Sequence, residues 1–485
     1  VLDDDGIHEG TIFQYASNDG TGVTGAYQNI QLVQDAIIAS YNGAGTITLG
    51  NGASLRNYGG MTAVFLTDGS KLVMERGSVI EDTKTVADRQ GDAIRTLKAV
   101  VEMQEGSCIR NLNSVDYINV ICAVEFPRSN ITINGEIVNC DCKKSHVVQL
   151  QHSDLTIGSA ARIHDNTSYY GVIYVQKGAK ADVYGKIYDN TVTGRGGAIS
   201  MTNHGDFSTG EEEIVNFYDG AVVRNNKGAS TGGGVMVCTG VFTMYGGEIS
   251  GNTCTDAGGG VYVRQGGQFI MHGGVIRENA ATTFGGGIAL VLNDWGGGSS
   301  CVQLHGGEIV NNTHGGASND LAIASEGFGH MGRYRYVSDD VTLGNAAIYF
   351  QQDQKTIAPA TGSRAVKFGN ASAGSVGALT QEALAKHWNT PLATFWVQRG
   401  GAAAMTVGGL QLTDGLPVYV LLQATREDGT PVTGEPVEVY TARRTGTEGE
   451  ILVTIPVVPA NGCAAAIVQP TSDPGSMTIT GPKSL

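Results

Sequence analysis

The sequence predicts an all-β protein whose main part is a parallel β-helix, and three observations support this fold class. Glycine accounts for 71 of the 485 residues and proline for only 11, a composition typical of closely spaced turns. A repeat of 26 or 27 residues restarts at Val235, Val261 and Ile288. Each repeat holds three short runs of alternating apolar residues, the pattern of strands with one buried face. Each coil of about 26 residues is therefore one turn of a solenoid.

Residues 1–60 precede the clear repeat and are expected to form an N-terminal cap. Within 26–41, the apolar residues Ile30, Val33, Ile37 and Ile38 follow helical spacing. A short amphipathic helix in this position would cover the open end of the coils, where strand edges are otherwise exposed. The pattern therefore predicts a capping helix.

Residues 61–350 are expected to form the β-helix, in about ten coils. One asparagine recurs at the same turn of successive coils, at Asn166, Asn190, Asn226, Asn252, Asn279 and Asn312. Stacked one coil above the next, these side chains would point inward and satisfy backbone groups at the corner. The spacing therefore predicts a buried amide ladder.

The periodicity ends near residue 350. Residues 351–411 are expected to form an irregular connector with one short helix over 380–388. From 412 to 485 the alternation of apolar residues returns, with Asp428 and Gly429 marking a tight turn. This last segment is predicted to be a small β-sandwich.

Charge and composition exclude several classes of function. The net charge of −15 argues against nucleic-acid binding, which needs a basic surface, and more weakly against anionic polysaccharides. No apolar run is long enough to span a membrane. The chain starts at Val1 with no leader, so we expect a mature or trimmed fragment of an exported protein, a monomer or part of a larger surface protein. The spacing of the eight cysteines indicates no disulfide framework, and most of them are expected to be free thiols.

The coils with the pattern GGG, GGEI and Asn at 231–312 resemble the right-handed parallel β-helix repeats of secreted bacterial proteins, over about 61–350. These include carbohydrate-active enzymes and adhesins, and the same coils are similar to those of lacto-N-biosidases with a β-helix body. Residues 412–485 resemble bacterial Ig-like modules, which are usually spacers. The resemblance implies right-handed coiling, an extracellular or cell-surface location, and a glycan or oligosaccharide partner.

Candidate site residues come from the outward positions and strand ends of the first sheet, where insertions at 203–213 and 293–300 interrupt the repeat. Hydrolysis of a glycosidic bond needs two carboxylates. Asp154 and Asp206 lie two coils apart and could reach the distance for inversion. Asp182 and Asp189 are a second candidate pair, suited to retention. The residues expected to bind substrate are His152, Tyr174, Gln176, His204, Arg264, Asp294 and Trp295.

Two further features were considered as sites. The row Tyr184, Tyr218, Tyr245, His272 and His305 on the second sheet could form an aromatic ladder that binds a glycan or stabilises the solenoid. No organic cofactor is expected and no metal site is assigned. Oxygen ligands around Glu326 and 339–340 would suit calcium, but no loop signature supports it.

The leading hypothesis is an extracellular glycoside hydrolase that acts on neutral host mucin or milk-type glycans through paired carboxylates in a groove on the flank of the β-helix. The alternative is a non-catalytic cell-surface adhesin or glycan-binding stalk. A polysaccharide lyase ranks third, because it would need cationic groups beside a uronate and the chain is acidic.

Overall fold

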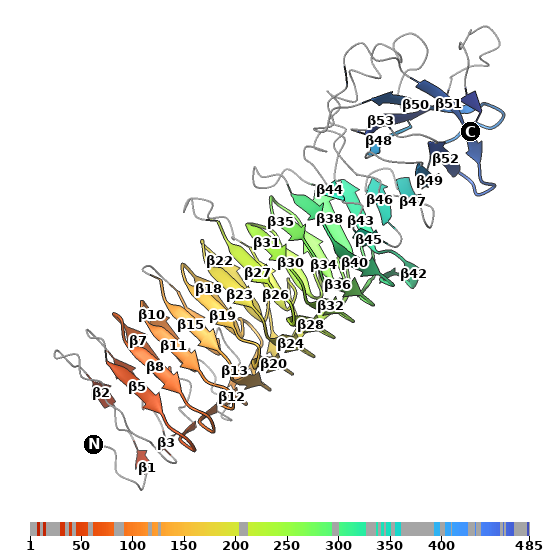
Figure 1. Cartoon of the computed structure of the whole chain (residues 1–485). Helices are drawn as coiled ribbons and strands as arrows, with labels where there is room; N and C mark the ends of the chain where they lie inside the picture. Colours follow the sequence, from red (N-terminus) through yellow and green to blue (C-terminus); the bar gives the residue numbers. More distant parts are fainter. Residues whose placement is uncertain are drawn as a thin grey trace.

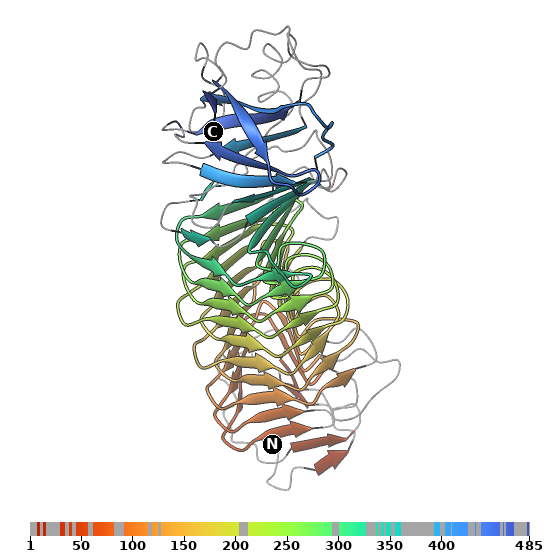
Figure 2. The same ribbon diagram turned by 90° about the vertical axis from the view of Figure 1, so that its right-hand side faces the viewer.

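The computed structural model describes residues 45–56, 62–81, 92–114, 119–124, 128–202, 212–292 and 300–325 continuously, and beyond them separate strands and short segments. The described chain forms an elongated parallel solenoid that ends in antiparallel strands (Figures 1 and 2). About 8 turns are complete. The predicted parallel β-helix is therefore confirmed as a fold.

One coil illustrates the arrangement of all of them. β22 (Ile173–Gln176), β23 (Lys180–Val183), β24 (Lys186–Tyr188) and β25 (Thr191–Val192) follow one another and lie in four different sheets. Each pairs in parallel with its counterpart one coil away. We call these the first, second, third and fourth sheets. The fourth strand, of two residues, was not predicted, because a run this short carries no alternation.

The first sheet carries the candidate site, and its strands stack in parallel order. They are β2 (Phe13–Tyr15), β4 (Ile38–Ser40), β7 (Val64–Thr67), β10 (Ile94–Leu97), β14 (Ile121–Ala123), β18 (Val148–Gln151), β22, β26 (Ile199–Met201), β30 (Val235–Val237), β34 (Val261–Val263), β38 (Ile288–Leu292), β43 (Leu321–Ser325) and β46 (Ala346–Phe350).

The second sheet lies next to the first in every coil. Its strands are β5 (Thr46–Leu49), β8 (Lys71–Met74), β11 (Val100–Met103), β15 (Asn130–Ile133), β19 (Asp154–Ile157), β23, β27 (Ile214–Phe217), β31 (Val241–Met244), β35 (Gln268–Met271), β39 (Cys301–Leu304) and β44 (Tyr336–Val337).

The third and fourth sheets complete the coil. The third contains β1 (Ile7–Glu9), β3 (Ile30–Val33), β6 (Ser54–Arg56), β9 (Val79–Glu81), β12 (Cys108–Arg110), β16 (Glu136–Val138), β20 (Arg162–His164), β24, β28 (Val222–Arg224), β32 (Glu248–Ser250), β36 (Val275–Arg277), β40 (Gly307–Val310) and β45 (Val341–Leu343). The fourth contains β13 (Asn113–Ser114), β17 (Asp141–Cys142), β21 (Thr167–Ser168), β25, β29 (Lys227–Gly228), β33 (Thr253–Cys254), β37 (Ala280–Ala281), β41 (Thr313–His314) and β42 (Ala317–Ser318).

The core lies inside the coils, where alternate side chains of the sheets meet. Ile173 and Val175 of β22 are fully buried, as are their equivalents in neighbouring coils. Phe217, Phe242 and Phe269 stack across three coils inside the second sheet, with ring centroids 5.9 and 5.6 Å apart. Since each coil buries its apolar face only against its neighbours, the stack is stabilised by repetition.

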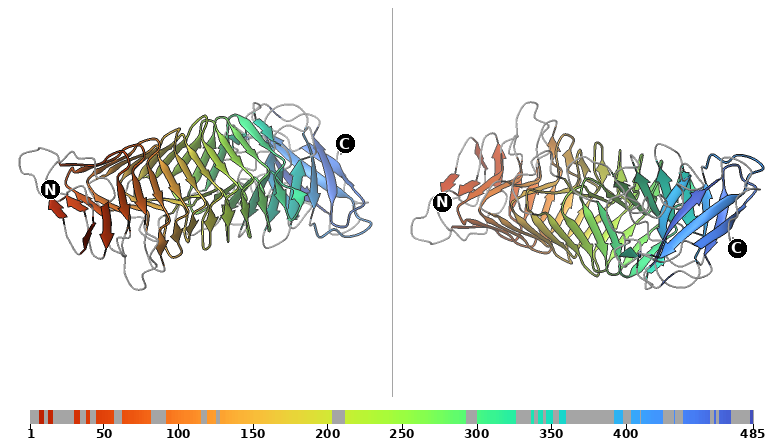
Figure 3. Two further views of the ribbon diagram at one scale, coloured as in Figure 1. Left: turned by 90° about the horizontal axis from the view of Figure 1, so that it is seen from below. Right: turned by 90° about the horizontal axis from the view of Figure 1, so that it is seen from above.

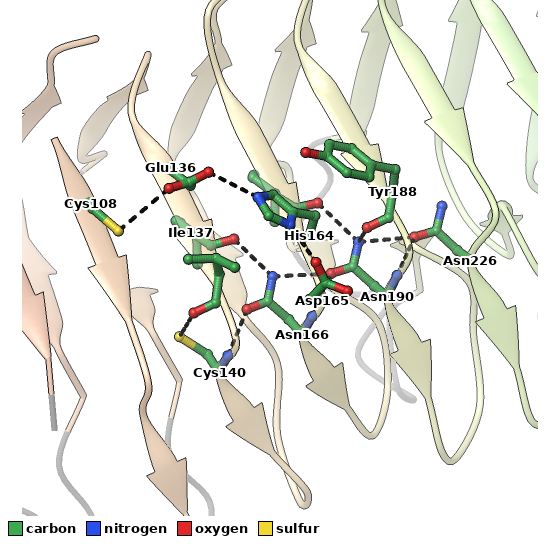
Figure 4. A network of polar contacts seen from close by, with 12 residues as sticks. Cys108, Glu136, Ile137, Cys140, His164, Asp165, Asn166, Tyr188, Asn190 and Asn226 are labelled. Atoms are coloured by element: carbon green, nitrogen blue, oxygen red, sulfur yellow. Dashed lines mark hydrogen bonds and ion pairs between the residues drawn. The ribbon is translucent and has the colours of Figure 1, made fainter. Parts of the chain in front are cut away.

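The predicted asparagine ladder is confirmed and is buried at the corner after the third sheet (Figure 4). Each asparagine donates its backbone N–H and its Nδ2 to the Oδ1 of the asparagine one coil on, as in Asn226 to Asn252, at 3.0 and 2.9 Å. The backbone N–H of Cys140 donates to Asn166 at the first end, and Asp320 accepts from Asn312 at the other.

The predicted capping helix over 26–41 is wrong. β3 and β4 occupy part of this segment, and both join the parallel sheets, with Ile30 paired with Leu55 and Ile38 with Val64. The apolar spacing fitted a helix, but Ile30 and Leu32 also alternate as in a strand. Pairing with the next coil supplies backbone hydrogen bonds to a strand, and these favour the strand over the helix.

At the C-terminal end the chain leaves the solenoid through antiparallel pairing (Figure 3). β46 pairs with β47 (Lys355–Pro359), which continues into a small antiparallel array. The remaining strands are β48 (Ala393–Val397), β49 (Ala403–Gly408), β50 (Val418–Ala424), β51 (Glu438–Arg444), β52 (Ile451–Ile455), β53 (Cys463–Val468) and β54 (Lys483–Ser484). The helix predicted over 380–388 lies outside the described residues.

Among the residues that the structure describes, no helix has the length and apolar character needed to cross a membrane.

Candidate functional site

The outward face of the first sheet changes character along the solenoid. The strand register places one outward side chain of each coil beside the next, in the order Arg95, Cys122, Gln149, Tyr174, Ser200, Met236, Tyr262 and Ala289. Phe65 precedes Arg95 in the same register, and the row is then polar from Arg95 to Ser200 and largely apolar from Met236 to Ala289. The same sheet therefore presents two different surfaces.

The corner that precedes each first-sheet strand also changes along the solenoid. Two residues before the strand, three successive coils carry polar side chains, Asp92, Asn119 and His146. Five later coils carry glycine instead, at Gly171, Gly197, Gly233, Gly259 and Gly286. A Cβ built on Gly233 would lie 2.6 Å from the carbonyl oxygen of Gly259, so the corners in the later coils are too tightly stacked for a side chain.

In the later coils these corners close over the sheet. Met236, Cys238, Ala257, Tyr262, Ala289 and Val291 form a separate buried apolar cluster, against which Phe284 packs. Ala257 and Phe284 come from consecutive corners and form a parallel bridge. We call this part of the flank, over 231–292, the closed flank.

In the earlier coils the flank is open and holds a pocket of about 250 Å³. Its walls combine the three polar corner residues with the start of the outward row and with residues of two loops. The lining residues are Asp92, Arg95, Asn119, Cys122, Val124, Lys144, Ser145, His146, Gln149 and Tyr170. We call this half, over 92–176, the open flank.

Asp92 lies at the base of the pocket and is only 4% exposed. Its Oδ1 accepts hydrogen bonds from the backbone N–H of Asn119 at 2.8 Å and from Asn119 Nδ2 at 3.2 Å. Its Oδ2 lies 3.6 Å from Arg95 Nη1. Burial raises the pKa of Asp92 above its ordinary value, and the Asn119 hydrogen bonds and the Arg95 charge offset only part of that rise.

The corner residues form a hydrogen-bonded ladder of their own. Asn119 Oδ1 accepts from the hydroxyl of Ser145 at 2.7 Å and from the backbone N–H of His146 at 3.3 Å. The His146 ring stacks on Tyr174, with centroids 4.0 Å apart, and lies 5.6 Å from the ring of Tyr170. The pocket thus has a fixed polar base and one aromatic wall.

Three of the residues predicted to bind substrate lie on the open flank, and a fourth, Arg264, lies on the closed flank. Tyr174 and Gln176 of β22 are buried, and Tyr174 supports the aromatic wall. His152 follows β18 with φ of 46°, and the half-buried Arg264 follows β34 near Cys238. His204, Asp206, Asp294 and Trp295 lie outside the described residues.

The two predicted carboxylate pairs have different settings. Asp154 begins β19 and forms an ion pair with Arg128 at 2.9 Å. Asp182 lies on the second sheet, where its Oδ1 accepts from Asn216 at 2.9 Å and from the hydroxyl of Tyr218 at 3.3 Å. Asp189 lies after the third-sheet strand β24 with φ of 54°. Asp182 and Asp189 thus belong to different faces of the coil.

The position of Asp189 has a backbone explanation. Asn111, Asn139, Asp165, Asn225 and Glu278 occupy the same corner of other coils, all with φ near 55°. Aspartate and asparagine tolerate this left-handed conformation better than most residues. A corner requirement therefore accounts for the row of polar residues there.

The aromatic row on the second sheet forms the predicted ladder. Consecutive rings from Tyr184 to His305 stack with centroids 4.4, 5.4, 5.4 and 4.9 Å apart. Because the rings face one another, they present mainly edges to solvent, whereas stacking on a sugar requires an open ring face. This geometry favours stabilisation of the coils over glycan binding.

A third polar network lies on the outward face of the third sheet (Figure 4). His164 lies between Glu136, 3.0 Å from its Nε2, and Asp165, 2.6 Å from its Nδ1. Its ring stacks on Tyr188 with centroids 4.6 Å apart. Burial lowers the pKa of His164, but the two hydrogen-bonded carboxylates outweigh burial and leave the pKa raised. Each group here is satisfied by its neighbours.

Cysteine and metal chemistry add nothing to these sites. The seven cysteines whose side chains are described are free thiols, and burial raises the pKa of Cys254 to about 11 and of Cys238 to about 12. The described residues contain no group of three or more histidine, cysteine or carboxylate side chains arranged for a metal ion. The calcium candidate around Glu326 and 339–340 lies outside them.

The sequence reasoning missed Asp92, Asn119 and His146. The signal was present in the alignment of coils, because these are the positions where glycine stands in later repeats. The predicted site residues lie on the strands and after them, whereas these three residues lie at the corner before the strands.

Comparisons with protein-family models, with curated proteins and with solved structures each gave no match for this chain. Its function must therefore be inferred from its own residues.

Proposed function

We propose that this chain is an extracellular or cell-surface glycan-binding protein, and that the pocket of the open flank holds one sugar unit. The observation that carries the proposal is the replacement of corner glycines by Asp92, Asn119 and His146 in three successive coils. Around Gly233, Gly259 and Gly286 the flank is closed and apolar. Where the polar residues stand, there is a pocket.

The chemistry of the pocket suits a polyhydroxylated ligand. Amide, imidazole, guanidinium and amine groups surround a small volume of about 250 Å³, below the ~300–1,000 Å³ of typical small-molecule sites. Tyr170 supplies an aromatic side to the same space. Directed polar groups beside one aromatic ring can bind both the hydroxyl groups and the apolar face of a sugar.

A glycoside hydrolase is the second candidate, and the environment of Asp92 favours it. A general acid needs a raised pKa, and burial raises the pKa of Asp92. Hydrolysis also needs a second carboxylate about 5–9.5 Å away. Asp92 is the only carboxylic acid among the described residues that line the pocket. Binding therefore has more support than hydrolysis.

The remaining parts of the chain fit a surface protein. The solenoid would hold the pocket away from its attachment, and the C-terminal antiparallel strands, as an Ig-like module, would serve as a spacer. A host mucin or milk-type glycan remains the proposed ligand. A right-handed β-helix of the secreted bacterial type would suit this role. A polysaccharide lyase stays the third candidate.

The test combines binding and cleavage. The full chain is applied to an array of host and milk-type glycans, and a parallel sample is incubated overnight with the same glycans and analysed by mass spectrometry. We expect retention that is lost in Gln149→Ala and kept in Thr156→Ala, whose side chain lies outward on the second sheet.

Asp92→Asn separates the two candidates, because Asn119 shows that asparagine fits the equivalent corner. Cleavage by the parent chain that disappears in Asp92→Asn would establish the hydrolase. Absence of both retention and cleavage would sink the proposal.

A further inference from the structure

We propose that the outward face of the third sheet over β20, β24 and β28 binds a sulfated glycan chain through Arg162, Lys186 and Arg224. The inference goes beyond the proposed function and shares only its extracellular location, because this face belongs to a different sheet from the pocket of the open flank. The net charge of −15 disfavours anions for the chain as a whole. A ligand meets the charge of the surface that it touches, and on this face that charge is positive.

The strand register brings the three cations together. Arg162 pairs with Lys186 in one outward column of the sheet, and His164, Tyr188 and Arg224 follow one another in the adjacent column. Neighbouring strands are about 4.8 Å apart. Arg162, Lys186 and Arg224 are all exposed. They are therefore neighbours on one open face.

None of these three cations has a carboxylate partner within the described part of the chain. Arg162 Nη1 donates to the backbone carbonyl of Ala160 at 3.2 Å, which leaves most of its guanidinium donors unused. The side chain of Lys186 makes no contact of this kind with a described residue. The positive charge is thus available to an anion from outside the chain.

Tyr188 orients Arg224 before any ligand binds (Figure 4 shows Tyr188 beside His164). The guanidinium carbon of Arg224 lies 5.3 Å from the centroid of the Tyr188 ring, a cation–π contact. His164 stacks on the same ring from the strand on the other side. The cation–π contact uses no N–H group, so the donors of Arg224 stay free. A side chain that is already ordered loses less entropy when it binds.

The nearest carboxylates are mostly bonded to other groups. Glu136 and Asp165 both bond to His164. Glu248, one strand beyond Arg224, bonds to Arg277 at 3.0 Å. These acids bound the positive face at its two ends without neutralising it.

Two further carboxylates, Asp189 and Asp219, lie at the corners that follow β24 and precede β28. Neither forms an ion pair with a described residue, and Lys227 of the adjacent coil stands just beyond the corner of Asp189. The strands and corners of this face over 136–202 and 212–278 all belong to the described residues. Arg162, Lys186, Arg224 and Lys227 therefore outnumber the two carboxylates that have no ionic partner.

The form of the face suits a chain that carries several sulfate groups. The cations are spread over three coils and two columns, so one small ion cannot contact all of them, whereas successive groups of a polymer can bind together. The planar fork of arginine and the point charge of lysine both suit an oxyanion. The proposed extracellular location supports a glycan as the carrier of these groups.

The test titrates the full chain at low salt with dextran sulfate and with uncharged dextran of the same length. We expect binding to the sulfated polymer alone, weakened as salt is added. The double variant Arg162→Gln with Lys186→Gln should bind dextran sulfate at least about fivefold more weakly.

Lys71→Gln with Arg110→Gln is the matched control. It also removes one lysine and one arginine charge, but from residues that are paired with Glu102 and Glu81. Unfolding midpoints verify that both double variants fold. Absence of binding to dextran sulfate, or equal weakening in the two double variants, would overturn the inference.

Two further outcomes separate this face from other sites and partners. Gln149→Ala should keep its binding to dextran sulfate, and loss of that binding would place the sulfated chain in the pocket of the open flank instead. Binding to vesicles of phosphatidylglycerol without binding to dextran sulfate would assign the face to a membrane surface and overturn the inference. Either result leaves the proposed function to its own test.

Discussion

The open and closed flanks of the first sheet are built from the same repeat and differ in what stands at one corner. In the closed flank, glycine allows successive corners to approach until a Cβ would clash, and the corners cover an apolar cluster. In the open flank, Asp92, Asn119 and His146 stand at this corner and line a polar pocket. A regular repeat stabilises itself, and a site arises where the repeat is broken.

The largest expected effect comes from placing an open-flank residue in the closed flank. Gly259→Asp would drive a side chain into the carbonyl groups of Ala280 and Gly286, both 2.6 Å from the position of a Cβ. We expect a loss of more than about 4 kcal/mol in the free energy of unfolding, measured in urea. Gly228→Ala is the control, since its nearest contact is 3.4 Å. A similar small loss in both variants would refute the tight-corner explanation.

The second effect concerns the asparagine corner, which extends from Asn166 to Asn312 and runs through the whole closed flank. Asn252→Ala would leave the backbone N–H of Asn226, one side-chain amide N–H of Asn226 and the carbonyl of Val223 without the partner that Asn252 provides. Burial of three such groups predicts a loss of about 3 kcal/mol or more. Asn139→Gly, at the exposed corner beside the ladder where glycine also accepts the left-handed backbone, should cost less than about 1 kcal/mol. Equal losses in the two variants would argue against a structural role for the ladder.

The third effect converts an open coil into a closed one. His146→Gly removes the ring that stacks on Tyr174 and lines the pocket. We expect glycan binding to fall about tenfold or more, as for a lost aromatic contact and polar partner, and the unfolding midpoint to change less than in Gly259→Asp. Glycan-array binding measures the first change and thermal unfolding of the same preparation measures the second. Unchanged binding would remove His146 from the site.

The smallest effect compares two histidines, one from each half. The carboxylates beside His164 leave its pKa raised, so its contribution to stability is present below about pH 6.5 and is lost as the pH rises through its folded pKa. Burial, and then the charge of His272, lowers the pKa of His305. Stability therefore falls as the pH drops below about 6.5 on account of His305.

Urea unfolding at about pH 5 and pH 8 tests the opposite signs of these two contributions. His164→Gln should lose more stability at the lower pH, and His305→Gln should lose less there. Both differences should stay below about 1 kcal/mol, because the groups are partly exposed to solvent. Shifts of the same sign in the two variants would contradict the assignment.

The fold was more predictable from sequence than the site. Alternation in runs such as Val261 and Val263 recurs along the solenoid and determines the strands, and the recurrence of asparagine from Asn166 to Asn312 determines the ladder. The segment around Ile30 fitted two periods, and pairing between coils decided between them. No local sequence pattern marks Asp92 as a site residue. Its role becomes visible only when its corner is compared with the glycine corners of later coils. The domain boundaries at 60, 350 and 411 stay predictions.

The asparagine ladder also gives the solenoid an electrical direction. Every side-chain amide from Asn166 to Asn312 donates toward the following coil, so the amide dipoles align and polarise one another along the axis. The positive end of this chain of dipoles lies at Asn312, where the carboxylate of Asp320 accepts two hydrogen bonds at 2.8 Å. As an anion does at the start of a helix, Asp320 neutralises the accumulated partial charge. The coils are therefore not interchangeable, since this end of the stack must bear a negative charge.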